Sequence, residues 1–480
     1  MSILRLNLTS LVKKNNIVIY GATIIFISLI LIFFISDRAK PKNLNVLLIT
    51  MDALRPDHLS CYGYKRNTSP NIDTLAKEGI LFTQAISQSS WTPPSIYSIL
   101  TSMYPHAHGV TDFGVSLKHN IQTLPEILKD NGYYVGLISG RGKLTEFHFS
   151  DLENNFDTFY PLSSDYISAK KISNNTIKWL RFNKEKKFFL WLYYLEPHAP
   201  YTPPLPYNKL YVNDEFMKED DKYIPIADKS RERYDGFKVI PRIAAVKGMT
   251  NINYYISQYD GEIRFADEQI GRVLKELKKL NLFNNTLIII SSDHGEYMGE
   301  DDLYFVHGNQ LHDAVIKVPL IFKCDTIFLK GKIINQQVAS IDIMPTILDI
   351  LCITKSKLSG SSLLPFILRG KNDSSRAVFS EYLGRDLGSA SKAKSTQISL
   401  RKAGWKLTYR SSDRKYELYN LNKDPGELIN VTNIEKGKFK FLKEILDSHM
   451  KNQEWMKNAN LNQTLDEQSK EKLRSLGYVQ

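Results

Sequence analysis

The fold of this chain is indicated by one stretch, Leu287-Ile288-Ile289-Ile290-Ser291-Ser292-Asp293-His294-Gly295-Glu296, in which an apolar run ends in polar residues. A short apolar run closed by turn residues is typical of a buried strand in a parallel sheet. Asp293 and His294 would then lie at the edge where open α/β sheets bind ligands. A carboxylate beside an imidazole can hold a divalent cation of the zinc or manganese type. An ordinary strand followed by a polar loop would have the same pattern.

A second strand with a similar ending favours the metal site. Residues 45–50 read Asn-Val-Leu-Leu-Ile-Thr and are soon followed by Asp52. Parallel strands end at the same edge of a sheet, so Asp52, Asp293 and His294 are predicted to converge on one cation.

Strand and helix patterns alternate along the rest of the chain. Strands are also predicted at residues 134–138, 188–195 and 318–323, and helices at residues 71–76, 124–132 and 263–280. In the last of these helices, apolar residues recur on one face with helical spacing. The alternation predicts an α/β fold, with a mainly parallel sheet sandwiched between helices.

The pattern changes after residue 352. Short strands at residues 377–382, 405–409 and 416–421 predict a small antiparallel α+β subdomain. The predicted organisation is a tail (1–16), an apolar segment (17–35), a linker (36–43), a large α/β domain (44–351), the C-terminal subdomain (352–433) and a helical tail (434–480).

Residues 201–253 interrupt the alternation. They are rich in Pro, Tyr and charge, have no sustained period, and directly follow Glu196-Pro197-His198. A long excursion inside a compact domain is often functional or mobile, so this segment is either a substrate wall or lid, or a surface loop without such a role.

The charge and cysteine content of the chain indicate which classes of binding partner are compatible with it. The net charge of +12 comes from basic residues mixed with acidic ones, and no nucleic-acid motif accompanies them. Nucleic acid is therefore not predicted as a partner, whereas an anionic substrate or an anionic membrane face is compatible with the charge. Cys61, Cys324 and Cys352 show no disulfide or metal-ligand spacing, so stability is not expected to depend on disulfides.

Residues 17–35 are almost wholly apolar and carry no charge. Their length is close to the ~20 residues that a spanning helix needs, which predicts a single-pass transmembrane anchor. A cleaved signal peptide is the alternative, but the run is longer than the usual ~7–15 apolar residues and lacks a good small-residue cleavage site. Basic residues flank both ends, so charge does not settle the orientation. We expect the domain after residue 43 to lie outside the cytoplasm.

A hydroxyl residue and two prolines precede another helical pattern at Thr92-Pro93-Pro94-Ser95. A helix beginning near Ser95 would offer N–H groups and a favourable dipole to a phosphate or sulfate, while Thr92 presents its oxygen to a metal. Alternatively, Thr92 and Ser95 simply cap the helix.

With these motifs the chain resembles the sulfatase branch of the alkaline phosphatase superfamily over nearly its whole length after the apolar segment. Each motif is weak alone, but their number and order are specific. The matching stretches are Asn45 to Asp52, Arg55-Pro56-Asp57, Cys61-Tyr62-Gly63-Tyr64, Ser69-Pro70-Asn71-Ile72-Asp73, Thr101-Ser102-Met103-Tyr104-Pro105-His106-Ala107-His108-Gly109-Val110, Glu196-Pro197-His198-Ala199-Pro200-Tyr201, Asp293-His294-Gly295-Glu296, Lys317-Val318-Pro319-Leu320-Ile321, Asp342-Ile343-Met344-Pro345-Thr346, and Glu417-Leu418-Tyr419-Asn420-Leu421 with Asp424-Pro425.

The resemblance implies roles for individual residues. Asp52, Thr92, Asp293 and His294 would bind the metal, with Thr92 also in the position of the nucleophile. His198 and His307 would act in catalysis. The implied substrate contacts are Ser95, Lys143, His198 and Asn309.

A second metal is not expected. Asp260 and Asp267 lie near positions where relatives with two zinc ions place ligands, but Arg264 replaces a histidine there, and Asp267 would then face solvent. His106 and His108 match the family pattern and are expected to have structural roles.

Several residues differ from the sulfatase pattern, and these differences affect the expected reaction and the expected metal. Sulfatases carry a Cys or Ser that becomes formylglycine, with Arg four residues later, where this chain has Thr92 and Ile96. Threonine cannot form that aldehyde, because its β-carbon bears a methyl group. Lys143 is the nearest substitute for the family's lysine. His294 replaces the Asn of calcium-binding sulfatases, which favours manganese or zinc over calcium.

These observations predict a membrane-anchored, sulfatase-like hydrolase of sulfuric or phosphoric esters that uses a divalent metal and a covalent Thr92 intermediate. Phosphate esters would be preferred, and the anionic ester substrate would belong to a glycan or a lipid. The alternatives are a transferase that moves a phospho-headgroup onto an envelope glycan or lipid, and a degenerate domain that binds glycans without catalysis.

Overall fold

The computed structural model describes residues 43–112, 115–140, 150–161, 168–212, 222–231, 233–328, 331–370, 373, 375–383 and 396–451. Residues Leu44–Gln480 form one compact unit, separate from Met1–Asn43. The predicted anchor at residues 17–35 lies outside the described residues. Within the described ranges, no helix is both long enough and apolar enough to span a membrane.

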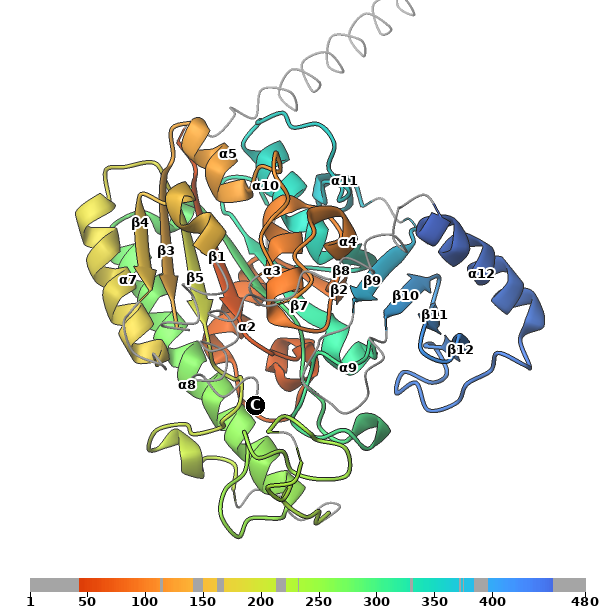
Figure 1. Cartoon of the computed structure of the whole chain (residues 1–480). Helices are drawn as coiled ribbons and strands as arrows, with labels where there is room; N and C mark the ends of the chain where they lie inside the picture. Colours follow the sequence, from red (N-terminus) through yellow and green to blue (C-terminus); the bar gives the residue numbers. More distant parts are fainter. Residues whose placement is uncertain are drawn as a thin grey trace, which may run out of the picture. The chain divides into compact units, whose positions relative to one another are not determined.

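An eight-stranded sheet forms the centre of the molecule (Figure 1), in the order β4-β3-β5-β1-β6-β7-β2-β8. Among the described strands of this sheet, β7 runs antiparallel to both of its neighbours, and the other pairings are parallel. The prediction of a mainly parallel sheet is therefore confirmed. The strand bounds are β1 Asn45–Met51, β2 Ile80–Ile86, β3 Tyr134–Ser139, β4 Thr158–Pro161, β5 Phe188–Tyr194, β6 Thr286–Ser292, β7 Lys317–Lys323 and β8 Lys332–Ala339.

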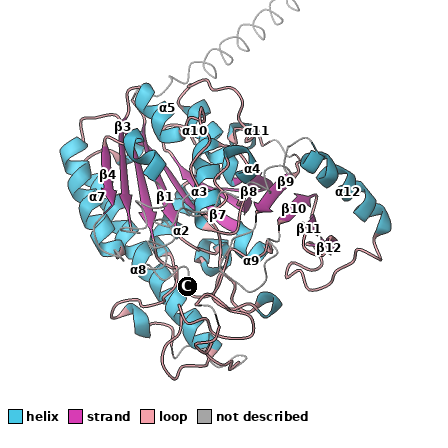
Figure 2. Cartoon of the chain, in the orientation of Figure 1, coloured by secondary structure: helices cyan, strands magenta, loops and turns pink. Residues whose placement is uncertain are grey.

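Helices cover both faces of this sheet (Figure 2). Side chains alternate across a strand, so β1 contributes to two cores. Leu47 and Ile49 pack in one core with residues of α2 (Pro70–Glu78), α7 (Ala169–Asn183) and α8 (Ile252–Lys279). Val46 and Leu48 pack in the other with residues of α3 (Thr92–Thr101), α5 (Leu124–Asp130), α10 (Ile343–Ile350) and α11 (Leu364–Arg369). The remaining short helices are α4 Pro105–His108 and α9 Asp313–Ile316, with 3₁₀ turns at Pro56–His58, Ser60–Tyr62, Ser150–Asn155, Tyr207–Lys209, Phe283–Asn285, Glu300–Asp302 and Ser340–Asp342.

The small C-terminal sheet was also predicted. It is antiparallel, in the order β12-β11-β10-β9, with β9 Val378–Tyr382, β10 Gln397–Lys402, β11 Trp405–Arg410 and β12 Lys415–Asn420. Helix α12 (Lys436–Lys451) buries Leu442 and Leu446 against Ile398, Leu400 and Leu407.

The structure adds elements that the sequence pattern did not indicate. Strands β2, β4, β8 and β10 were not predicted, because polar residues interrupt them or they are short. Helix α8 begins at Ile252 rather than near residue 263, with the Asn251 side chain accepting a hydrogen bond from the amide of Tyr254 at 3.3 Å. The excursion after residue 201 is thereby shortened, and its Tyr201 and Ile240 are buried in the core beside α8.

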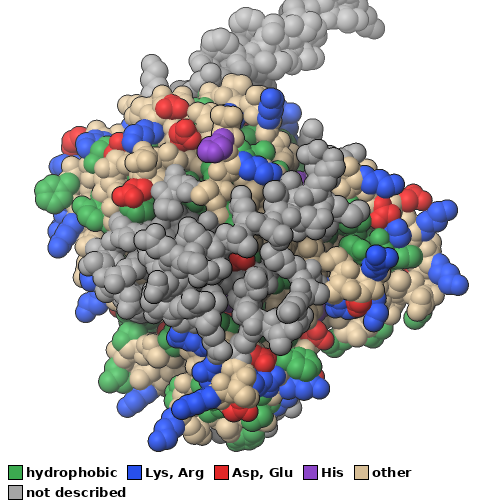
Figure 3. Space-filling model, in the orientation of Figure 1, with side chains coloured by type: hydrophobic (Ala, Val, Ile, Leu, Met, Phe, Trp, Pro, Cys, Tyr) green, Lys and Arg blue, Asp and Glu red, His purple; other side chains and the backbone are tan. Residues whose placement is uncertain are grey.

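Charge is spread over the visible surface. On the face drawn in Figure 3, Lys and Arg side chains of the described residues are scattered and mixed with Asp and Glu. The basic side chains visible on this face are thus not gathered in one patch.

Candidate metal centre and active site

The three side chains predicted to bind a metal converge at the edge of the sheet. Met51 of β1 is the pairing partner of Ser292 of β6, so the next residues, Asp52 and Asp293, leave the sheet side by side. His294 Nε2 lies 3.4 Å from Asp52 Oδ1 and 3.5 Å from Asp293 Oδ2. All three side chains are fully buried, and their ligand atoms lie within 4.8 Å of one another.

This donor set fits a divalent cation. His294 Nδ1 lies 2.8 Å from the carbonyl oxygen of Gly295, which can only accept, so Nδ1 carries the hydrogen. Nε2 therefore faces two buried carboxylates, an arrangement that needs a cation between them, either a proton or a metal ion. An imidazole with two carboxylates is a ligand set for zinc or manganese, and its geometry here favours Nε2 as the ligand atom.

Thr92 stands beside this cluster. Its Oγ1 lies 3.2 Å from His294 Nε2. Helix α3 begins at Thr92 itself, three residues before the predicted start, and Trp91 is the N-cap residue without a side-chain capping bond. The alternative that Thr92 caps the helix is therefore wrong, and the hydroxyl points to the metal ligands instead.

The Ser95 side chain forms hydrogen bonds with the segment that precedes Thr92. Its hydroxyl donates to the carbonyl oxygen of Ser89 at 3.0 Å and lies 3.2 Å from the hydroxyl of Ser87. Ser87 Oγ in turn donates to the carbonyl oxygen of Asp293 at 2.5 Å. Ser95, predicted as a substrate contact, therefore helps to fix the segment before Thr92 against the end of β6.

Sequence reasoning missed Tyr193. It lies in β5 beside Thr50 of β1, and its phenol donates to Asp52 Oδ2 at 2.7 Å and contacts Asp293 Oδ2 at 3.1 Å. A tyrosine in an apolar strand looks like a core residue, so only its position near the strand end could have suggested this role. Tyr193 bridges the two carboxylates and holds them in the orientation that a shared ion requires.

Of the two predicted catalytic histidines, His307 lies beside His294, and His198 lies beside His307. The ring centroid of His307 is 4.3 Å from that of His294 and 5.1 Å from that of His198. Glu296 Oε1 lies 2.9 Å from His307 Nδ1, and Tyr201 donates to Glu296 Oε2 at 3.1 Å. Burial raises the pKa of Glu296 to about 7, although His198 and His294 oppose this. Glu296, quoted only within a motif, is thus the residue that orients His307.

The remaining predicted substrate contacts are Lys143 and Asn309. Lys143 lies outside the described residues. Asn309 binds the C-terminal sheet through its backbone, because its carbonyl oxygen accepts a hydrogen bond from Gln397 Nε2 at 3.1 Å.

The acids considered for a second metal have other partners. Asp260 binds His58 at 2.7 Å and Arg66 at 2.8 Å. Asp267 is fully buried, so the expectation that it faces solvent is wrong. Its carboxylate accepts from the backbone amides of Asn71 and Ile72, at the first turn of α2.

His108 has the structural role that was expected. It is fully buried, and burial lowers its pKa to about 3. Its Nδ1 accepts from the amide of Val110 at 3.1 Å, so Nε2 carries the hydrogen and donates to the carbonyl oxygen of Pro94 at 3.2 Å. A neutral imidazole thereby supports the first turn of α3, next to Thr92.

Comparison with known proteins agrees with this geometry. A sulfatase family model matches residues 44–353, and a model for the C-terminal part of N-sulphoglucosamine sulphohydrolase matches residues 302–457. An uncharacterized sulfatase of Escherichia coli (strain K12) is 26% identical over 360 residues, covering 67% of this chain and 71% of that protein. Iduronate 2-sulfatase of Homo sapiens is 30% identical over 331 residues, covering 58% of this chain and 59% of that enzyme.

Solved structures share the fold at lower identity. The phosphonate monoester hydrolase of Agrobacterium radiobacter superposes with a TM-score of 0.69 at 23% identity, covering 84% of this chain and 95% of that chain. Since the family model spans more than half of the sequence and includes Asp52, Thr92, Asp293 and His294, this chain belongs to the sulfatase family of ester hydrolases.

Proposed function

We propose that the chain is a metal-dependent hydrolase that forms a covalent ester on Thr92 and prefers phosphate esters to sulfate esters. One observation carries the proposal: Thr92 Oγ1 lies 3.2 Å from His294 Nε2, beside the buried carboxylates of Asp52 and Asp293. A nucleophile next to metal ligands is the arrangement expected for covalent transfer of an anionic group.

Asp52, Asp293 and His294 would hold the cation, with Thr92 as a further oxygen ligand. When bound, the cation would lower the pKa of the Thr92 hydroxyl and offset negative charge on the transferred group. Thr92 Oγ1 would bond to phosphorus and pass its proton to His198 or His307 as the bond to the leaving oxygen breaks, and one of these imidazoles would supply a proton to that oxygen. Water would then attack phosphorus and release phosphate and the Thr92 hydroxyl.

The preference for phosphorus rests on the side chain of Thr92. A formylglycine hydrate has a second hydroxyl on its β-carbon, so its sulfate ester can collapse by elimination without attack at sulfur. Threonine lacks that hydroxyl, and its ester must wait for attack on the central atom. Two solved proteins of the same fold are phosphonate monoester hydrolases, which supports a phosphorus centre for this site.

A panel of aryl phosphate monoesters, phosphate diesters and sulfate esters with one common leaving group, assayed with manganese, zinc or calcium, tests the proposal. We expect phosphate turnover with manganese or zinc. Thr92→Ala should lower kcat by about 10³-fold or more, and Thr92→Ser should retain activity. Thr83→Ala is the control, because this residue lies on β2 and its hydroxyl donates to Asn335 rather than to the cluster around Thr92. Acid-quenched enzyme should carry one phosphoryl group on Thr92, detected by mass spectrometry.

Two results would sink the proposal. One is faster cleavage of the aryl sulfate than of the matching aryl phosphate, with that activity lost in Thr92→Ala. The other is no turnover of any ester with any metal, which would favour the glycan-binding alternative. Release of the leaving group only when an acceptor alcohol is supplied would instead identify the transferase.

We further propose that residues 17–35 anchor the chain in a membrane, with the domain from residue 44 outside the cytoplasm. The uncharged apolar run supports this proposal. The chain should stay in the membrane fraction after alkaline washing, and a C-terminal reporter that works only outside the cytoplasm should be active. A mature protein beginning near Lys40 would instead reveal a cleaved signal, and a reporter active only inside the cell would reverse the orientation.

A further inference from the structure

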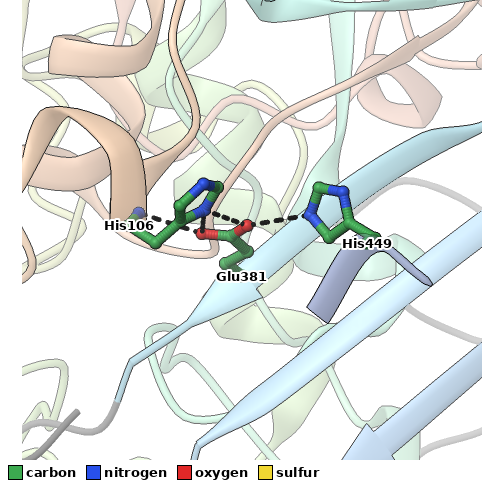
Figure 4. Close-up of side chains that lie close together, drawn as sticks. All are labelled: His106, Glu381 and His449. Carbon is green, nitrogen blue, oxygen red and sulfur yellow. Dashed lines mark hydrogen bonds and ion pairs between the residues drawn. The ribbon is translucent and has the colours of Figure 1, made fainter. Parts of the chain in front are cut away.

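A second group of ligand-type side chains lies outside the active site. Figure 4 shows His106, Glu381 and His449 turned toward one another. They come from α4, β9 and α12, and Glu381 lies 275 residues after His106 and 68 residues before His449. Side chains so far apart in sequence meet here only because the C-terminal sheet and α12 pack beside the start of the α/β domain.

The donor atoms converge on one carboxylate oxygen. Glu381 Oε1 lies 2.6 Å from His106 Nδ1 and 3.2 Å from His449 Nε2. The other oxygen, Oε2, accepts the backbone amide of His106 at 3.0 Å and lies 2.8 Å from His106 Nδ1. The backbone amide therefore fixes the carboxylate, while Oε1 and the two imidazole nitrogens face a common point.

Aromatic neighbours orient both imidazoles. The His449 ring stacks on Phe379 with centroids 3.7 Å apart and planes 6° apart, and the His106 ring stacks on Tyr104 with planes 18° apart. Glu381 is fully buried, whereas the His106 and His449 side chains keep 9% and 8% of their surface exposed. The group is thus oriented in advance and reachable from solvent, as an ion site must be.

We propose that His106, Glu381 and His449 bind one zinc-type divalent cation, separate from the active-site metal. Two imidazoles and one carboxylate suit zinc, whereas calcium and magnesium prefer oxygen ligands. Their ligand atoms lie within 4.8 Å of one another, which leaves room for bonds of about 2.0–2.2 Å after small side-chain movements. His106 Nδ1 and His449 Nε2 would each give up any proton they carry, and water would complete the coordination.

Lys118, a lysine close to this group, does not bind the Glu381 carboxylate. Lys118 Nζ donates instead to the carbonyl oxygen of His106 at 2.9 Å. A divalent ion at this point would compensate the charge of the buried Glu381 carboxylate.

Such an ion would connect α12 to the segment that precedes Thr92. The Glu381 amide donates to the carbonyl oxygen of Gln88 at 2.8 Å, and Ser89 Oγ donates to the carbonyl oxygen of Glu381 at 2.9 Å. The metal would thus clamp the C-terminal helix, strand β9 and the segment before the nucleophile. Its expected role is structural, and it does not depend on the reaction proposed above.

Zinc binding to the full chain tests the site without any assay of activity. The double variant Asp52→Asn/Asp293→Asn removes the active-site carboxylates and serves as the background. After equilibration with zinc and gel filtration, this background should retain one zinc ion per chain by elemental analysis. Adding His449→Gln should lower zinc retention at least tenfold, whereas adding His119→Gln, an exposed histidine outside both groups, should leave it unchanged.

Thermal unfolding with zinc or with a chelator gives the second measurement. Zinc should raise the melting temperature of the background and of the His119→Gln control, but not that of the His449→Gln or Glu381→Gln variants. The proposal is wrong if the background retains no zinc, or if His449→Gln and Glu381→Gln retain as much as the background. It is equally wrong if these variants melt lower by the same amount with zinc and with chelator, because the group would then be a hydrogen-bonded clamp alone.

Discussion

At the end of β5, one phenol touches both carboxylates of the candidate metal centre. Tyr193 is fully buried, and without its hydroxyl Asp52 and Asp293 would lose a shared hydrogen-bonding partner. Groups that orient metal ligands typically change metal affinity when removed, even though they do not touch the ion.

Tyr193→Phe should therefore weaken manganese or zinc binding at the active site by about 10- to 100-fold while leaving the fold intact. Chelator competition measures the affinity, and circular dichroism checks the fold. Tyr133→Phe is the matched control, because its hydroxyl donates to the Leu44 carbonyl at the opposite end of β1. Unchanged metal affinity in Tyr193→Phe would remove Tyr193 from the site.

At the same scale, His312 is expected to make the free energy of unfolding depend on pH. It is the N-cap residue of α9, and burial, with Lys406 nearby, lowers its pKa to about 4. In the unfolded chain this imidazole takes up a proton near its usual pKa of about 6.5, so the free energy of unfolding falls as the pH drops from there toward 4.

His312→Asn should reduce this loss of stability. Between about pH 7 and pH 5, the free energy of unfolding of the wild type should fall by about 2 kcal/mol more than that of the variant, since Asn does not titrate and also caps helices. Urea unfolding at both pH values measures the difference. His119→Gln is the exposed control, and equal pH slopes for wild type and His312→Asn would contradict the assignment.

At the scale of elements, the N-terminus of helix α2 is capped by a residue far away in the sequence. Helix α2 has Ser69 as N-cap residue without a side-chain capping bond. Asp267 of α8 supplies the missing acceptor, with its Oδ1 3.0 Å from the amide of Asn71 and 2.8 Å from that of Ile72. A negatively charged carboxylate at a helix N-terminus also interacts favourably with the helix dipole.

Replacing Asp267 by alanine should lower the free energy of unfolding by about 2 kcal/mol, because buried amides lose their acceptor. Lys275→Ala, at an exposed position on the same helix, should change it by less than about 0.5 kcal/mol. Urea unfolding compares the two. Similar stabilities for both variants would show that α2 does not depend on this cap.

At the scale of the whole molecule, buried charges attach the C-terminal sheet to the α/β domain. Lys406 of β11 has no exposed surface on its side chain, and its Nζ lies 3.1 Å from Asp313 Oδ1 and 2.7 Å from Glu427 Oε1. Arg401 of β10 also pairs with Asp313, at 2.7 Å. Asp313 begins α9, just before β7, so these pairs connect the two sheets.

Lys406→Met keeps the volume but removes the charge, leaving Asp313 and Glu427 buried with one cation fewer. We expect a loss of about 3–5 kcal/mol in the free energy of unfolding. The exposed Lys415 provides the control Lys415→Met, which should be nearly neutral. Equal unfolding curves for the two variants would mean that the ion pairs do not hold the subdomain in place.

The sequence alone determined the layers of this protein and most of the candidate metal centre. Apolar runs such as residues 287–290 predict buried strands, and Asp52, Asp293 and His294 follow strand ends directly. Parallel strands end together, so local pattern and topology suffice to bring these residues to one edge. Periodicity also predicted the C-terminal sheet, apart from β10, which contains only two apolar residues, Ile398 and Leu400.

Tertiary structure alone decided the contacts between distant segments. Tyr193 looks like any aromatic residue of a buried strand until β1 lies beside it, and Asp267 looks like a surface acid until the first turn of α2 lies beside it. His106, Glu381 and His449 share no local pattern. Their meeting depends on how α12 and β9 pack against the α/β domain, and such packing follows from the burial of whole faces rather than from the spacing of residues within a segment.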